Sequence, residues 1–233
     1  MGFLFDSLWE AVAMIARFDA DLREALFTTL QVSVTSTIIA AVIALPLGFL
    51  IARHDFRGRR AVLTLLRTAL ALPTVVVGLL VYAFIARNAP LGEMRLLFTQ
   101  TAIVIGQVIL IVPLVTALVH SAMRDTLLMV YEEAILLGAS PLRASWQAIL
   151  EARFAVITAL MTGFGRVVSE VGVALMLGGN IRGHTRTITT AITLETGQGH
   201  FAIAFALGIV LLALVLAINL GVQLAGGKRW STM

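Results

Sequence analysis

Two charged residues lie inside one apolar segment of the sequence. Arg166 and Glu170 stand four residues apart in a stretch that is otherwise hydrophobic and rich in glycine. Residues at this spacing share one face of a helix and can form an ion pair. Because a charge at the bilayer centre costs about 2.5 to 3.5 kcal/mol on insertion scales, such a pair is expected to face protein or water. The pair therefore marks a translocation path or a helix interface, and both roles can coexist.

A second polar group follows this segment and combines guanidinium, hydroxyl and amide side chains. Guanidinium forks, hydroxyls and backbone N–H groups are donors that can bind a tetrahedral dianion. The same residues can instead seal a gate or dock a partner, and we favour these roles, because a transporter that holds its anion too tightly cannot release it. No metal site is predicted, since the other histidines do not stand at ligand spacing from this group. Its members are Asn180, Arg182, His184, Thr185, Arg186 and Thr187.

A third group lies in the longest polar segment between hydrophobic stretches. Acidic residues, a small residue and a glycine at this spacing predict a helix, a tight turn and a second helix. Such a short helix is suited to seating in a groove of a partner protein, while its carboxylates anchor the preceding helix or meet basic groups. An ordinary loop between two spans is the alternative. The residues concerned are Glu132, Glu133, Ala134, Gly138, Ala139 and Ser140.

The elements that position these groups are predicted to be transmembrane helices. Of the 233 residues 59% are hydrophobic and only 13% are charged, against about 25% charged residues in soluble domains. A water-soluble globule cannot bury so much apolar surface. Each charge-free run is long enough to cross a hydrocarbon core of about 30 Å. The runs without Asp, Glu, Lys or Arg are 25–52, 68–86, 96–123 and 196–227.

We predict an all-α membrane protein with five transmembrane helices, with proline kinks at Pro46, Pro73 and Pro113. Basic loops favour the cytoplasmic side. This rule places the N-terminus outside and the C-terminus, with the tail 227–233, inside. Residues 1–25 are expected to form an extracytoplasmic segment, either an amphipathic helix or a leader without fixed structure. The transmembrane domain is predicted at 26–226, with spans at 26–52, 66–86, 99–120, 154–178 and 201–226 and a cytoplasmic segment at 121–153.

Several function classes are excluded by what the sequence lacks. There is no cysteine, so no disulfide or thiolate metal site can form. Gly226-Gly227-Lys228 is followed by Arg229 and does not complete a phosphate-binding loop, so the chain does not hydrolyse ATP by itself. No constellation typical of an enzyme has a soluble cleft to occupy. The basic excess is only 17 against 13 residues, without a basic stripe, which argues against nucleic acid.

Two motifs resemble those of a known family. The segment from Glu132 to Glu151 resembles the EAA loop of bacterial ABC-importer permeases, although Glu133 replaces the first Ala, and Ala148 and Glu151 replace the Ile and Pro of its tail. The stretch 163–192 resembles the molybdate, sulfate and tungstate permeases. Its Gly-Gly-Asn-Ile-Arg-Gly-His-Thr-Arg run and the later Leu-Glu-Thr are most similar to tungstate permeases.

This resemblance implies a type I ABC importer permease of the MetI-like fold, working as a homodimer in a bacterial or archaeal cell membrane. Each subunit would dock an ATP-binding subunit through residues 126–150, with ATP and Mg on that partner and no cofactor on this chain. An extracytoplasmic binding protein would deliver tungstate, or next molybdate or sulfate. The alternatives are a stand-alone channel or ion-coupled carrier that uses Arg166 and Glu170 as a relay, or a membrane scaffold that transports nothing.

Overall fold

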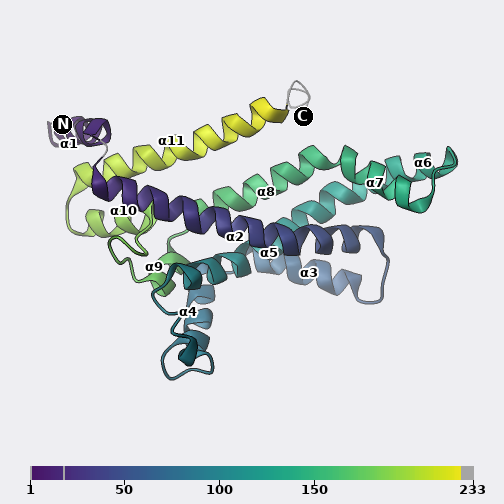
Figure 1. The fold of residues 1–233 in the computed structure, drawn as a ribbon, viewed down its shortest axis with the longest axis horizontal. Helices are drawn as coiled ribbons and strands as arrows, with labels where there is room; N and C mark the ends of the chain where they lie inside the picture. Colours follow the sequence, from purple (N-terminus) through teal and green to yellow (C-terminus); the bar gives the residue numbers. More distant parts are fainter. Residues whose placement is uncertain (1, 18, 227–233) are drawn as a thin grey trace. The chain divides into compact units, whose positions relative to one another are not determined.

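The computed structural model describes residues 2–17 and 19–226, so the predicted tail 227–233 lies outside the described residues. Every regular element in the described part of the chain is a helix (Figure 1). Helices suit an apolar chain, because each backbone group finds its hydrogen-bond partner within the segment. The elements are α1 (Gly2–Arg17), α2 (Ala20–Arg53), α3 (Arg59–Leu70), α4 (Thr74–Ile85), the 3₁₀ helix η1 (Gly92–Met94), α5 (Gln100–Thr126), the π-helix η2 (Leu127–Tyr131), α6 (Glu132–Leu136), α7 (Pro141–Glu151), α8 (Arg153–Val168), α9 (Gly172–Gly178), α10 (Ile188–Gly197) and α11 (Phe201–Gly226).

Three helices of the described residues, α2, α5 and α11, are long and apolar enough to cross a membrane. Two helix pairs, α3 with α4 and α7 with α8, also qualify if each pair is counted as one broken span. The described chain therefore holds up to five spans, in agreement with the predicted number. Pro46 and Pro113 lie inside α2 and α5, as expected of prolines that a long helix accommodates.

Two predicted spans are wrong as continuous helices. The span predicted at 66–86 breaks between Leu70 and Thr74. Pro73 accounts for the break, because proline has no N–H to donate and disfavours helical geometry in the residue before it. The span predicted at 154–178 breaks between Val168 and Gly172.

The described residues divide into two compact units, and α2, α5 and α8 contribute to both. The first unit contains the chain up to Thr35, Thr74–Gln107 and the chain from Val167 onward. In its core α1 and α10 pack against α11, and α4 packs against α9 (Figure 1). The second unit contains Ser36–Pro73 and Val108–Arg166, and its core joins residues of α2, α5, α7 and α8.

Small residues allow close helix packing within the first unit. A Cβ atom added to Gly106 of α5 would lie 2.5 Å from Cγ1 of Val173 in α9. In membranes, where lipid is as apolar as a leucine side chain, such close approach of backbones is a main source of helix association. Gly106 therefore holds α9 against α5.

Candidate functional site

The polar group at residues 180–187 lies in the first unit, between α9 and α10. Threonine hydroxyls tie its backbone together. Thr185 Oγ1 donates a hydrogen bond to the Gly178 carbonyl and accepts one from the Ile181 N–H. Thr187 caps α10 in a capping box with Thr190, so orphan N–H groups at that helix start are satisfied. The hydroxyls of Thr185 and Thr187 are therefore already hydrogen-bonded to groups of the protein itself.

Helix α2 supplies a further hydroxyl to the same region. The buried Thr29 accepts a hydrogen bond from the Ile188 N–H at 2.8 Å and donates to the Ala25 carbonyl. Gln100 of α5 donates to the His184 carbonyl at 2.7 Å, and Asn180 donates to the Thr190 carbonyl at 3.3 Å. The segment that the sequence presented as a donor cluster is thus bonded to elements distant in the chain.

Arg182 forms an ion pair that the sequence does not predict. Its guanidinium binds the carboxylate of Asp21, with Nε donating to Oδ1 at 2.8 Å and Nη2 donating to both oxygens. The hydrogen bond to Asp21, followed by the charges of Asp21, Glu24 and Asp19, raises the pKa of Arg182 above its usual value. The residues are 161 positions apart, so no spacing rule reveals the pair. The only available signal was the acidic composition of residues 19–24.

Arg186 faces a similar acidic environment. It lines a small cavity of about 90 Å³ together with Asp19, Asp21 and Glu195, and the rest of the lining is mainly apolar. Its Nε atom is buried and has no hydrogen-bond partner among the described residues. A dianion entering this cavity would meet carboxylates beside the guanidinium. In this conformation the region is suited to holding protein segments together and poorly suited to holding an oxyanion.

Glu170 lies in the break between α8 and α9. Its side chain is buried, with 3% of the residue exposed, and its Oε1 accepts a hydrogen bond from the Val173 N–H at 3.2 Å. Its carbonyl accepts a hydrogen bond from the buried hydroxyl of Thr189 at 2.8 Å. A carboxylate at a helix start satisfies an orphan N–H and interacts favourably with the helix dipole. Glu170 therefore links the start of α9 to the start of α10.

The expectation that Arg166 and Glu170 share one helix face is wrong. Helix α8 ends at Val168, and the chain between Val168 and Gly172 is not helical. The four-residue spacing places two side chains on one face only where the helix is continuous. Arg166 itself is exposed in the last turn of α8.

The third polar group forms a helix, a turn and a second helix, as the sequence predicts. Glu132 and Glu133 begin α6, and Gly138 adopts a left-handed conformation with φ of +86°. The Gly138 and Ala139 N–H groups donate to carbonyls of α6, which closes the turn. Ser140 precedes the proline that begins α7. The π-helix η2 directly before α6 was not predicted.

This helical hairpin presents an apolar surface. The exposed fractions are 85% for Leu136, 88% for Leu137 and 81% for Leu142. Ala144 and Ala148, on the other face of α7, are buried. One face of the hairpin thus packs into the core of the second unit, to which it belongs, and the opposite face leaves large apolar side chains uncovered.

Comparison with known proteins decides what kind of molecule carries this architecture. Residues 44–227 match the family described as binding-protein-dependent transport system inner membrane component. The chain belongs to this permease family. It is therefore a multi-pass membrane component of a transport system and not an enzyme. This membership favours the importer over the stand-alone channel or carrier that the sequence left open.

Relatives of the permease cover almost the whole chain. The tungstate uptake system permease protein TupB of Campylobacter jejuni is 40% identical over 94% of this chain and 92% of its own. TupB of Peptoclostridium acidaminophilum is 36% identical over 94% and 96%. A probable anion ABC transporter permease protein of Haloferax volcanii is 37% identical over 82% and 84%.

Solved structures confirm the predicted fold of the permease. A bacterial alginate ABC transporter, crystallised with a periplasmic protein carrying an alginate pentasaccharide, has a chain that matches with a TM-score of 0.67 and 19% identity. The match covers 92% of this permease and 81% of that chain.

Among the described residues of the permease, no group of three or more His, Cys, Asp or Glu side chains is arranged to hold a metal ion.

Proposed function

We propose that this permease carries tungstate into the cell as the membrane subunit of an ATP-driven importer, with molybdate and then sulfate as the next candidates. The observation that carries the proposal is the 40% and 36% identity to two tungstate uptake permeases over 94% of the chain. Discrimination among the oxyanions is expected to lie mainly in a separate binding protein on the outer face, since a permease must bind its anion weakly enough to release it.

The hairpin of α6 and α7 is proposed to dock the ATP-binding subunit, which would hold ATP and Mg. Leu136, Leu137 and Leu142 form an exposed apolar patch, which is the usual sign of a protein interface. Glu132 and Glu133 flank this patch and supply charges to a basic partner. Gly138, Ala139 and Ser140 shape the turn between the helices.

The region at 180–187 is proposed to act as a gate and a docking point, and not as a tight oxyanion site. The bond of Arg182 to Asp21 and the carboxylates around Arg186 support this choice. His184 and Asn180 take part through backbone and amide hydrogen bonds, and Thr187 through its helix cap. Arg166 and Glu170 are assigned to the translocation path or to the gate that controls it.

The complete importer is proposed to contain two copies of the permease and two ATP-binding subunits. The N-terminal segment 1–25 would lie outside, the segment 121–153 and the tail 227–233 inside, and residues 26–226 would form the transmembrane domain. ATP binding would close the nucleotide-binding subunits, shift the α6–α7 hairpins and open the path outward, and hydrolysis would reset it inward. In physical terms the permease has an inward-open and an outward-open state, and binding events on its cytoplasmic and outer faces both shift the equilibrium between them.

Oxyanion-stimulated ATPase activity in liposomes tests this proposal. The permease would be coexpressed with the ATP-binding and substrate-binding proteins encoded beside it, purified as a complex and reconstituted. We expect tungstate to stimulate ATP hydrolysis more than molybdate or sulfate does. Absence of a complex and of stimulation, together with ion flux through this chain alone, would refute the importer.

A further inference from the structure

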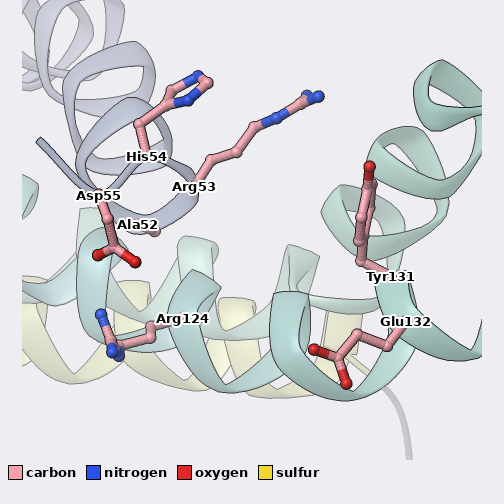
Figure 2. A pocket seen from close by; sticks show the side chains of 7 residues that line it. All are labelled: Ala52, Arg53, His54, Asp55, Arg124, Tyr131 and Glu132. Atoms are coloured by element: carbon pink, nitrogen blue, oxygen red, sulfur yellow. The ribbon is translucent and has the colours of Figure 1, made fainter.

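A cavity of about 280 Å³ lies in the second unit where α2 ends. Its lining mixes basic, acidic and aromatic side chains. Figure 2 shows Asp55 and Arg124 pointing toward one another, whereas Arg53 extends from the end of α2 toward the side of Tyr131. The complete lining is Ala52, Arg53, His54, Asp55, Arg124, Tyr131 and Glu132.

Neighbouring residues hold two of these charged side chains in place. Arg53 donates a hydrogen bond to the Ser145 hydroxyl at 2.8 Å, and its guanidinium lies 5.9 Å from the centre of the Tyr131 ring. Because a guanidinium has five N–H donors, most of those on Arg53 stay available for a guest. Asp55 accepts a hydrogen bond from Arg59 at 3.0 Å, so its charge is offset.

Arg59 also shapes the loop that forms one wall of the cavity. Its Nε donates to the Ile51 carbonyl at 3.0 Å, near the end of α2, and its Nη2 lies 3.1 Å from Nε2 of His120. These bonds fold the loop back over the end of the helix. This wall is therefore held by partly buried hydrogen bonds within the protein, and it does not need a bound molecule to form.

Three formal charges on the lining are left without a neutralising ion-pair partner. Arg124 and Glu132 form no hydrogen bond or ion pair within the described part of the chain, and Arg53 is bonded only to neutral groups. The lining thus carries two guanidinium groups and two carboxylates, and of the carboxylates Glu132 is the one without an ion-pair partner among the described residues. A simple anion would leave Glu132 unmatched, whereas a guest with a phosphate and an ammonium group a few bonds apart would satisfy both signs.

The position of the cavity favours a lipid as the source of such a guest. The charge-free run 25–52 ends at Arg53, which places the lining at the depth where phospholipid headgroups lie. We propose that this cavity binds the phosphoethanolamine headgroup of a membrane lipid. The phosphate lies against Arg53 and Arg124, and the ammonium group lies against Glu132.

Lipid retention by the full-length chain tests this site. The permease would be purified in detergent, supplied with phosphatidylethanolamine, phosphatidylcholine and phosphatidylglycerol of identical acyl chains, and analysed by native mass spectrometry. We expect a preference for phosphatidylethanolamine over phosphatidylcholine of about two- to fivefold, the size expected of one exposed charge pair. Phosphatidylcholine shares the phosphate but carries no N–H donor, so the comparison isolates the ammonium contact.

Two substitutions should separate the two contacts. Glu132→Gln should abolish the preference for phosphatidylethanolamine, and Arg124→Gln should weaken retention of phosphatidylethanolamine and phosphatidylcholine alike. Glu133→Gln and Arg143→Gln are matched controls, because both residues are exposed on the same hairpin and neither lines the cavity. Circular dichroism and gel filtration would verify that each variant folds.

Three kinds of result would overturn the site. The first is the absence of a preference that depends on Glu132, seen either as equal retention of phosphatidylethanolamine and phosphatidylcholine by the unmodified chain or as an equal loss of preference in Glu133→Gln. The second is a preference for phosphatidylglycerol that Glu132→Gln strengthens, which would indicate a site for a simple anion. The third is displacement of the lipid by inorganic phosphate. The assay requires neither ATP nor cargo, so its failure is separable from a failure of the proposed transport function.

Discussion

The buried carboxylate of Glu170 is predicted to hold the start of α9. Glu170→Ala removes the acceptor of the Val173 N–H, which then stays buried and unsatisfied. Leaving such a donor without a partner costs about 1 to 3 kcal/mol. Glu170→Gln keeps a carbonyl oxygen as acceptor at that place and removes the negative charge, for which helix-dipole effects suggest about 0.3 to 1 kcal/mol. The alanine variant should therefore be clearly the less stable of the two.

Thermal unfolding in detergent measures this difference. For a chain of 150 to 250 residues, 1 kcal/mol shifts the melting temperature by about 2 to 4 °C. We expect a decrease of about 4 to 8 °C for Glu170→Ala, taking 2 kcal/mol as the central cost, and of less than about 4 °C for Glu170→Gln. Glu93→Ala is the control, because Glu93 is exposed and caps nothing in the described chain. Equal decreases for the two Glu170 variants, or none beyond that of Glu93→Ala, would refute the capping role.

Three further predictions concern the proposed gate and the docking hairpin. Gly138→Val should abolish ATPase coupling without preventing membrane insertion, because valine is strained at φ of +86°. Gly58→Val is the control: it introduces the same strain at φ of +94° in another loop, and this variant should still copurify with the ATPase. Arg186→Ala should reduce oxyanion uptake more than it reduces complex assembly, and normal uptake at all concentrations would remove Arg186 from the gate. Asp21→Asn should speed hydrogen exchange at residues 180–187, and adding Arg182→Gln should have little further effect, because both changes break the same ion pair.

The long helices could be predicted from the sequence because their determinants are local. Uninterrupted apolar runs produce α2, α5 and α11, and the acid-glycine spacing predicts the turn at Gly138. The span around Pro73 was predicted as kinked but continuous, although the missing N–H of that proline can also end a helix. The sequence around Pro73 does not show whether neighbouring helices will hydrogen-bond the carbonyl groups that a kink leaves free, so a kinked helix was predicted where the helix breaks.

The site was predicted less completely, because its bonds connect distant parts of the chain. The sequence identified Arg182, Arg186 and their neighbours as a polar group, but not the carboxylates that surround them. The partner of Arg182 is Asp21, on a different helix, and nothing in their spacing relates them. Glu170 was assigned to a helix face because its spacing from Arg166 fits one, and that reasoning failed where the helix ends.

These bonds bear on the proposed role of residues 180–187 as a gate. An oxyanion would need donors that are free or easily freed, yet Arg182 is bound to Asp21 and the Thr185 hydroxyl is bound to the Gly178 carbonyl. Substrate contact would require breaking an ion pair and exposing carboxylates to a dianion. Movement of the group as one connected piece, together with α9 and with the start of α2 that holds Asp21, breaks none of these bonds. A gate that moves as a unit is therefore the less costly role, and the Asp21→Asn exchange experiment distinguishes it from a substrate site built of independent donors.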